Sequence, residues 1–565
     1  MPITGPRPLP LLAALTAGVL LLAGCSSGTG TGTGPGSGSG AGATAGQDGT
    51  AEQPVQGGAL TYATDVEPIS FDIHVSQQDI TGAIQRNVFD SLVHQDDKGE
   101  FQPWLATSWE VAPDLKSYTF HLREGVKFTD GTPFDAEAVK ANFDRIVAKE
   151  TKSQYAASLL GPYTGTEVID PRTVKVSFAE PFAPFLQAAS TAYLGFYSPK
   201  AIKENGTKLG AGGPADVGTG PFVFSSYTKG QSAVFTRNPD YNWAPPSANH
   251  QGPAYLEKLT IRFLAEDSVR VGALNSGQVQ VAEPIPPADV RTVQGDPKLR
   301  TIATDAPGAN YALVLNTSKA PLDDPLVRKA VQRGIDLDTD VQSVYFGVYK
   351  RAWSPVGPST PYYDKSLEKS WPYDQAAANK ALDEAGWTAR DGDGYRTKDG
   401  KRLTLEWPLP PAEYVREQRE TLGQAIQADL KKIGVEVTRP RLDIGTFIAN
   451  TYGGKEHIAD YSWARFDPDV LRLYFHSASK PSTGGQNATF YQDAQLDEWT
   501  TTGKGTFDKA VRQDVYTKTQ RRAIELGLIV PLYVRTAVVG SSVKVRGLKA
   551  DPNTWLAFHG AWLAK

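Results

Sequence analysis

The side chains most often used in enzyme chemistry are sparse and scattered in this 565-residue sequence. Its seven histidines include no close pair at the spacing of a metal site, and an isolated histidine is more often a structural residue than a ligand. They are His74, His94, His121, His250, His457, His476 and His559. The folded part has no G-x-S-x-G elbow, H-E-x-x-H motif, Walker loop or dinucleotide fingerprint. We therefore predict no catalytic residues, no cofactor and no metal, and a chain that is not an enzyme.

One acidic stretch, Asp391-Gly392-Asp393-Gly394, has the composition of a calcium loop. An EF-hand loop also needs an Asp or Asn at its fifth position and Gly at its sixth, where this chain has Tyr395 and Arg396. Asp-Gly pairs are also typical of tight turns between strands. We therefore expect a hairpin turn here.

The elements that must position any site are of both kinds. Residues 117–123 and 174–178 alternate between apolar and polar side chains, as half-buried strands do. Asp135, Asp324 and Asp374 each stand where a helix N-cap is expected before an apolar stripe. Strands and helices mix along the chain, so the fold class is expected to be α/β (mixed α+β) with at least two sheets.

Composition limits the possible functions. Hydrophobic residues make up 40% and charged residues 21%, as in ordinary globular protein, and the length predicts two or three domains. The formal net charge of −4 gives no basic surplus for nucleic acid. The single cysteine, Cys25, excludes an internal disulfide and any multi-cysteine metal site.

The first 57 residues have the pattern of a targeting segment. A mostly apolar run follows Arg7 and is too short for a confident membrane span, but it suits a signal peptide. It ends in Leu22-Ala23-Gly24-Cys25, which resembles the bacterial lipobox. We expect a signal peptide at 1–24 and acyl chains on Cys25 that anchor the protein at the outer face of the cytoplasmic membrane. Residues 25–57 are rich in Gly, Ser, Thr and Ala, and are expected to be a flexible tether.

Four stretches resemble the family 5 extracellular solute-binding proteins, the group that includes dipeptide-, oligopeptide- and nickel-binding proteins of ABC importers. They are SYTFHLREGVKFTDGTPFDAEAVKANFDRI at 117–146, GTGPFVFSSYTKGQSAVFTRNPDY at 218–241, the segment 312–335 with PLDDPLVRKAVQRGI at its end, and WARFDPDVLRLYFHS at 463–477. They occur in the family's order. Gly218, Gly220 and Pro221 in the second stretch suit a tight entry to a strand, which is a structural role.

The resemblance implies a periplasmic-binding-protein-like fold in which two lobes close around a cleft, with an extra domain inserted in the first lobe. The expected parts are lobe I at 58–96, 218–307 and 536–565, the inserted domain at 97–217, and lobe II at 308–535.

The last stretch bears on ligand recognition. In the peptide-binding members an aspartate four residues before the proline holds the peptide's α-amino group, and this offset falls on Ala464 here. The charged residue beside it is Arg465, whose guanidinium suits a carboxylate, phosphate or sulfonate. The structural alternative is an ion pair with Asp460, Asp467 or Asp469.

The resemblance implies further ligand-binding candidates. Trp463 matches an aromatic residue that walls the family's pocket, and core packing is its alternative. His74 lies in the family's early loop at the cleft mouth, where it either contacts ligand or faces solvent. Tyr311 precedes a second-lobe strand as cleft wall or core, and Tyr193 and Phe196 precede an element near the cleft.

The function implied is that of a lipid-anchored, monomeric receptor that delivers a peptide or peptide-like solute to ABC permease subunits. Other cargo stays open: a nickel chelate, an oligosaccharide or an opine-like anion. A sensory lipoprotein that presents ligand to a membrane kinase, and a lipoprotein hydrolase with dispersed carboxylates, are the alternatives of other classes.

Overall fold

The computed structural model describes residues 52–96, 98–483 and 485–565, and the folded unit spans Pro54–Lys565. The signal peptide, Cys25 and most of the tether lie outside the described residues. Among the described residues, no helix has the length and apolar character needed to cross a bilayer.

A seven-stranded sheet is built from distant parts of the chain. Its strand order is β12-β22-β11-β1-β10-β9-β8, in which β1 runs parallel to both of its neighbours and the other pairs are antiparallel. The strands are β1 (Ala59–Thr64), β8 (Phe222–Thr228), β9 (Ser232–Arg237), β10 (Lys258–Phe263), β11 (Val281–Glu283), β12 (Leu299–Asp305) and β22 (Thr536–Ser542). Successive residues of β1 point to opposite faces, so that Leu60 and Tyr62 join one core cluster and Ala63 joins another.

A second sheet has the order β14-β21-β13-β20 and is antiparallel throughout. Its strands are β13 (Gly308–Leu315), β14 (Lys350–Arg351), β20 (Ile458–Ala464) and β21 (Ile529–Val534). All eight residues of β13 are buried, because this strand lies between β20 and β21 and is covered on both faces. The largest core cluster of the described chain surrounds it.

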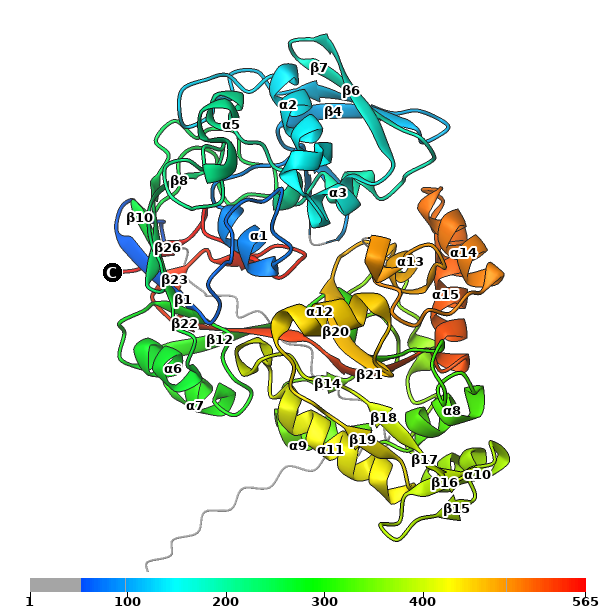
Figure 1. Ribbon diagram of the computed structural model, residues 1–565. Coiled ribbons are helices and arrows are strands. Elements are labelled where there is room, and N and C mark those ends of the chain that lie inside the picture. Colours follow the sequence, from blue (N-terminus) through cyan, green and yellow to red (C-terminus); the bar gives the residue numbers. More distant parts are fainter. Residues whose placement is uncertain (1–51, 97, 484) are drawn as a thin grey trace, which may run out of the picture. The chain divides into compact units, whose positions relative to one another are not determined.

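The chain passes between these two sheets at two adjacent places. One is the step from β12 to β13, and the other is Arg535, the single residue between β21 and β22. The amide of Ala306 donates to the carbonyl of Arg535 at 2.8 Å, and Thr536 Oγ1 donates to Asp305 Oδ1 at 2.8 Å. In Figure 1, β21 and β22 form one nearly continuous ribbon that links the sheets. The two crossings are therefore hydrogen-bonded to each other.

A third sheet is formed within one stretch of chain. It has the antiparallel order β4-β5-β7-β6, and α2 packs on β6 and β7. The elements are β4 (Ala106–Val111), β5 (Ser117–Leu122), α2 (Ala136–Val147), β6 (Tyr163–Asp170) and β7 (Thr173–Phe178). Tyr118, Phe120 and Phe143 are fully buried in its aromatic core.

The remaining elements cover these sheets or form small ones. The helices are α1 (Asp79–Gln85), α3 (Tyr155–Leu160), α4 (Phe185–Ala188), α5 (Pro199–Asn205), α6 (Asp267–Asn275), α7 (Val290–Gly295), α8 (Pro325–Arg333), α9 (Leu337–Tyr345), α10 (Gln375–Glu384), α11 (Arg419–Lys432), α12 (Ile444–Gly453), α13 (Val470–Phe475), α14 (Ala494–Lys504) and α15 (Lys509–Glu525). The short strands are β2 (Val93–Gln95), β3 (Phe101–Pro103), β15 (Ala389–Arg390), β16 (Arg396–Lys398), β17 (Lys401–Arg402), β18 (Thr404–Glu406), β19 (Glu436–Thr438), β23 (Val545–Arg546), β24 (Lys549–Ala550), β25 (Leu556–Ala557) and β26 (Trp562–Leu563).

The mixed α/β fold class predicted from the sequence is confirmed. The N-caps also form as expected: Asp135, Asp324 and Asp374 each accept a hydrogen bond from an amide in the first turn of α2, α8 and α10. The acidic stretch 391–394 is a turn between β15 and β16, in which Asp391 Oδ1 accepts from the amides of Asp393 and Tyr395 at 3.0 and 3.1 Å.

Candidate ligand-binding cavity

A cavity of about 1140 Å³ lies beside the two crossings. One wall comes from the seven-stranded sheet and α1, and the other from the start of α11 and the residues before it. The charged side chains that line it are Asp65, Asp79, Glu266, Asp267, Glu283, Arg416, Glu417, Arg419, Glu420 and Arg535. A space of this size holds a small organic molecule or a short peptide.

An unusual backbone turn presents one group of these side chains. Glu417 and Gln418 both have left-handed backbones, with φ of 56° and 54°, directly before α11. Consecutive non-glycine residues in this region are uncommon and gather at functional sites. The turn places Arg416, Glu417 and Arg419 on the cavity wall.

Arg535 is the central cation of the cavity. Its Nε donates to Glu417 Oε1 at 3.0 Å, and its Nη1 lies 3.8 Å from Asp79 Oδ2. Burial acts to raise the pKa of Glu417, but the charges of Arg535 and Arg419 outweigh it and hold that pKa below its usual value. Glu417 is therefore ionised and fixed, and Tyr533 also donates to its Oε2 at 2.6 Å.

Two carboxyl groups of the cavity are less well compensated. Burial raises the pKa of Glu283 to about 7, and Tyr62 donates to its Oε2 at 3.2 Å. Burial also raises the pKa of Asp79, against the opposing charge of Arg535. The cavity therefore combines fixed ion pairs with carboxyl groups whose charge depends on what lies beside them.

One ion pair joins the two walls. Arg416 Nη1 lies 2.5 Å from Asp65 Oδ2, which follows the end of β1. Arg419 Nη1 donates to the hydroxyl of Tyr311 at 3.2 Å, and its guanidinium carbon lies 5.0 Å from the centre of that ring. The second wall is thus attached both to the first wall and to β13 behind it.

Comparison with known proteins decides the family. The profile of bacterial extracellular solute-binding proteins, family 5 (middle region), matches residues 100–484. The chain belongs to this family.

Relatives and solved structures agree with this assignment. The glutathione-binding protein GsiB of Escherichia coli (strain K12) is 27% identical over 87% of this chain and 92% of its own. NikA from Brucella suis, solved in complex with Fe(III)-EDTA, is 28% identical, with a TM-score of 0.78 over 90% of this chain and 100% of its own. The ABC transporter-associated periplasmic protein DppA from Helicobacter pylori, in complex with the peptide STSA, is 25% identical, with a TM-score of 0.75 over 90% and 99%. The family consists of extracytoplasmic substrate-binding components of transporters, with a two-lobe fold.

The two tyrosines predicted for the site of this family 5 protein lie directly behind the cavity wall. The hydroxyl of Tyr311 donates to Asp460 and supports Arg419, and its ring stacks on Tyr533 with centres 5.1 Å apart. The hydroxyl of Tyr193 donates to the carbonyl of Gln78, a wall residue, at 2.6 Å. Both side chains are buried. Direct ligand contact by either stays a prediction.

Trp463 lies where two parts of the chain meet. It is half-buried at the end of β20, and packs against the core around β13 and the core of the third sheet. Its ring meets Tyr155 edge-on, with centres 5.4 Å apart.

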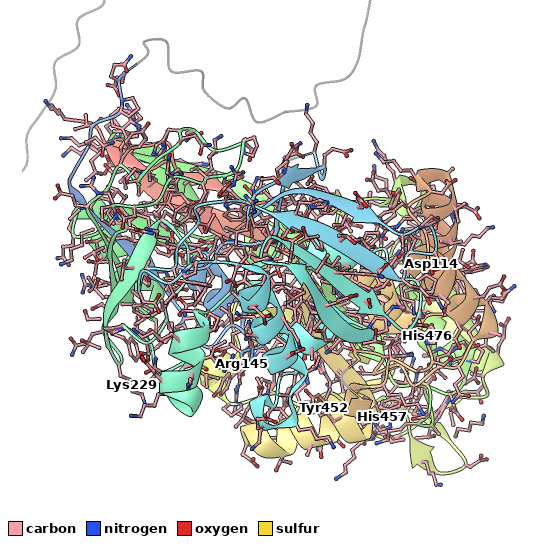
Figure 2. All side chains as sticks on the ribbon, turned by 90° about the horizontal axis from the view of Figure 1, so that it is seen from above. Asp114, Arg145, Lys229, Tyr452, His457 and His476 are labelled. Carbon is pink, nitrogen blue, oxygen red and sulfur yellow. The ribbon has the colours of Figure 1, made fainter. Side chains whose placement is uncertain are left out.

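His74 and Phe196 lie deeper in this protein. His74 is fully buried, with Nε2 3.1 Å from the carbonyl of Gly195 and Nδ1 2.8 Å from Arg145 Nη1. Figure 2 labels Arg145, which α2 contributes. Phe196 packs among the rings of Phe134 and Phe143. Neither residue is on the cavity wall in this conformation.

Arg465 is 1% exposed, and all three of its side-chain nitrogens lack a hydrogen-bond partner in the described chain. The ion pairs proposed for it as an alternative do not form. Asp467 pairs with Arg512 at 2.7 Å, Asp469 pairs with Arg472 at 2.9 Å, and Asp460 accepts from Tyr311.

The charged residues of the cavity wall were not predicted from the sequence. The charged run Arg416-Glu417-Gln418-Arg419-Glu420 contains several of these residues, and its composition is typical of the exposed start of a helix. Asp79 and Glu283 are ordinary acidic residues in sequence, and the fold alone brings them to Arg535. The density of charge before α11 was the one available signal.

Proposed function

We propose that this family 5 protein is the substrate-binding component of an ABC importer, and that it captures a peptide or peptide-like solute in the cavity beside the crossings. The observation that carries this proposal is the cavity itself: about 1140 Å³, with one wall from the seven-stranded sheet and α1, the other from the start of α11, and charges of both signs. A zwitterionic solute suits such walls, because its ammonium and carboxylate groups each find a partner of opposite charge.

The proposed parts are lobe I at 58–96, 218–307 and 536–565, the inserted domain at 97–217 and lobe II at 308–535. The sheet composition supports these limits: the strands of the seven-stranded sheet fall in the three segments of lobe I, and those of the second sheet fall in lobe II. The two crossings would be the hinge about which the lobes close.

The protein acts, in this proposal, as a binding protein and not as an enzyme. The cavity carboxyl groups serve recognition, and the cargo leaves with its bonds intact. Cys25 and the signal segment lie outside the described residues, and we propose lipid attachment there from the lipobox alone. The anchored monomer would stand at the outer face of the cytoplasmic membrane and deliver cargo to permease subunits.

A second candidate cargo is a metal chelate. The structure of NikA, with a TM-score of 0.78 to this chain, holds Fe(III)-EDTA. Glutathione, the peptide STSA and Fe(III)-EDTA, which the relatives' names give, are therefore the compounds to test first.

The experiment is native mass spectrometry of the purified protein, followed by calorimetric titration with these three compounds. We expect a saturable complex with one molecule per chain, and recovery of the unchanged compound after denaturation. Recovery of a cleaved or modified compound would contradict the proposal, as would the absence of any complex.

A further inference from the structure

The strongest unexplained feature of the molecule is the buried guanidinium of Arg465. It is 1% exposed, and its Nε, Nη1 and Nη2 have no hydrogen-bond partner in the part of the chain that the structure describes. Charged groups are almost never buried in this state, because desolvation disfavours an ion that has no counterion or acceptor. The described residues offer no acceptor that offsets this cost.

The chain has three acidic residues near Arg465 in sequence, and uses them elsewhere. Asp467, two residues away, accepts from Arg512, and Asp469 accepts from Arg472. Asp460 accepts from Tyr311. Each of these three carboxylates thus has another partner, and Arg465 has no hydrogen-bond partner in the described chain.

Arg465 lies at a seam between two parts of the chain. On one side is the end of β20, where Gly308 packs against the backbone of Arg465. A β-carbon on Gly308 would be 2.4 Å from the amide nitrogen of Arg465. On the other side is segment 97–217. Trp463 meets the ring of Tyr155, and a β-carbon on Gly99 would be 2.9 Å from the ring of Phe466. Residues on both sides of Arg465 therefore pack against a segment that would move away if the lobes opened.

Aromatic side chains lead from this seam to the cavity wall. The ring of Tyr155 is 4.6 Å from that of Tyr193, which is 5.8 Å from that of Trp555 on the wall. Burial raises the pKa of Tyr155 to about 12, opposed by the charge of Arg465, with Asp79 acting on the same hydroxyl from the cavity side. Tyr155 is thus close enough to both Arg465 and the cavity carboxyl group of Asp79 to feel their charges.

We propose that Arg465 is an anion subsite, which receives a carboxylate group of the cargo when the seam is open and encloses it when the seam closes. This inference rests on the proposed function and adds a substrate class: solutes with a free carboxylate, held by charge-assisted hydrogen bonds to a guanidinium. The aromatic residues beside it, Tyr155 and Trp463, exclude water from the bound group. A carboxylate fits the planar guanidinium through two parallel hydrogen bonds.

The test uses Arg465→Met, which keeps the side-chain volume and removes the charge. If the arginine stabilised the fold, this substitution would lower the stability of the ligand-free protein. Substitution of an arginine without partners should not lower it. We expect the ligand-free variant to melt at the wild-type temperature or above. Arg512→Met is the matched control, because Arg512 is also buried but is ion-paired with Asp467, which is two residues from Arg465 in sequence. This variant should melt clearly lower.

The binding arm uses three probes: citrate, the peptide Ser-Thr-Ser-Ala as its free acid, and the same peptide as its carboxamide. We expect citrate and the free acid to raise the melting temperature of the wild type. The carboxamide and Arg465→Met should each weaken peptide binding by roughly 10- to 100-fold, and Arg465→Lys should recover part of the affinity.

The outcomes separate the two proposals. Equal binding of acid and carboxamide, or a loss of ligand-free stability in Arg465→Met as large as in Arg512→Met, overturns the anion subsite and leaves the proposed function in place. Binding of citrate through Arg465 without binding of either peptide supports the subsite and counts against peptide cargo. No effect of any probe on the wild type overturns the subsite.

Discussion

Arg535 Nε lies 3.0 Å from Glu417 Oε1, and this ion pair connects the crossing between the two sheets to the turn that begins the α11 wall of the cavity. Tyr533, the neighbour of that crossing in β21, donates to the other oxygen of Glu417 at 2.6 Å. Two bonds from adjacent parts of the crossing therefore fix one carboxylate, and with it the left-handed turn at Glu417 and Gln418.

Replacing Glu417 by glutamine should loosen this connection. The variant keeps the shape and one acceptor but loses the charge, so we expect the free energy of unfolding to fall by about 1–2 kcal/mol. Urea unfolding at pH 7 measures this. Glu420→Gln is the control, since Glu420 also lines the cavity but pairs with Arg441 in a half-exposed bridge, and should change stability by less than about 0.5 kcal/mol. Equal losses in both variants would contradict the argument.

The buried pair Arg145–Asp72 should matter more than any surface pair. Arg145 Nη1 donates to Asp72 Oδ1 at 3.0 Å, and Asp72 is 3% exposed. Arg145→Met leaves that carboxylate buried without its cation, which should lower the free energy of unfolding by about 3–5 kcal/mol. Arg172→Met removes the exposed pair with Glu124 and should cost about 0–1 kcal/mol. Thermal or urea unfolding of both variants gives the comparison, and a small loss for Arg145→Met would show that water replaces the pair.

His74, beside this pair, should make stability depend on pH. Burial, with the charge of Arg145, lowers its pKa to about 4, against an unfolded value of 6.5. Between these values the unfolded chain binds a proton that the folded chain does not, so the contribution is complete above pH 6.5 and is lost as the pH falls to 4. The full loss is roughly 3 kcal/mol.

His74→Gln tests this, because it removes the titrating ring and keeps an amide that can donate to Gly195. The difference in unfolding free energy between the wild type and His74→Gln should shrink from pH 7 to pH 4.5. Since Asp72 titrates in both proteins, the difference isolates the histidine. A difference that stays constant with pH would mean that His74 titrates normally in the folded state.

Sequence patterns predicted the local elements well and the cavity poorly, for a physical reason. The caps at Asp135 and Asp324 and the turn at Asp391 depend on neighbours within a few residues, so their types alone specify the geometry. The cavity wall depends on contacts across hundreds of residues, such as Asp79 with Arg535, and no local pattern encodes these. Arg465 was noticed because it departs from a family pattern, and its lack of partners could be known from the structure alone.

The glycines of the second family stretch support a structural prediction. A β-carbon on Gly218 would lie 2.1 Å from the carbonyl oxygen of Val88, so Gly218→Ala forces two backbone segments apart. We expect a loss of about 1–3 kcal/mol in urea unfolding. Gly272→Ala is the control: its β-carbon would meet open space within α6, and alanine favours the helix, so stability should stay equal or rise by up to about 1 kcal/mol. Loss in both variants would point to a general effect of the substitution.

The ion pair Lys504–Glu180 should favour the closed conformation. Lys504 Nζ lies 2.6 Å from Glu180 Oε1, and the amide of Ala183 donates to the carbonyl of Lys504 at 2.9 Å. These contacts join segment 97–217 to the end of α14, so they break if the proposed lobes part. Lys504→Met removes the charge and keeps the backbone bond.

We expect Lys504→Met to raise the dissociation constant for cargo about 2- to 5-fold, because a single partly exposed ion pair contributes little. The radius of gyration of the ligand-free variant, measured by X-ray scattering, should be larger than that of the wild type. Adding Glu180→Met should change neither quantity further, because the pair is already broken. Lys518→Met is the matched control, since Lys518 pairs with Asp514 within α15 and joins no two parts of the chain. If Lys518→Met had the same effect, the change would reflect net charge, and the Lys504–Glu180 pair would have no part in closure.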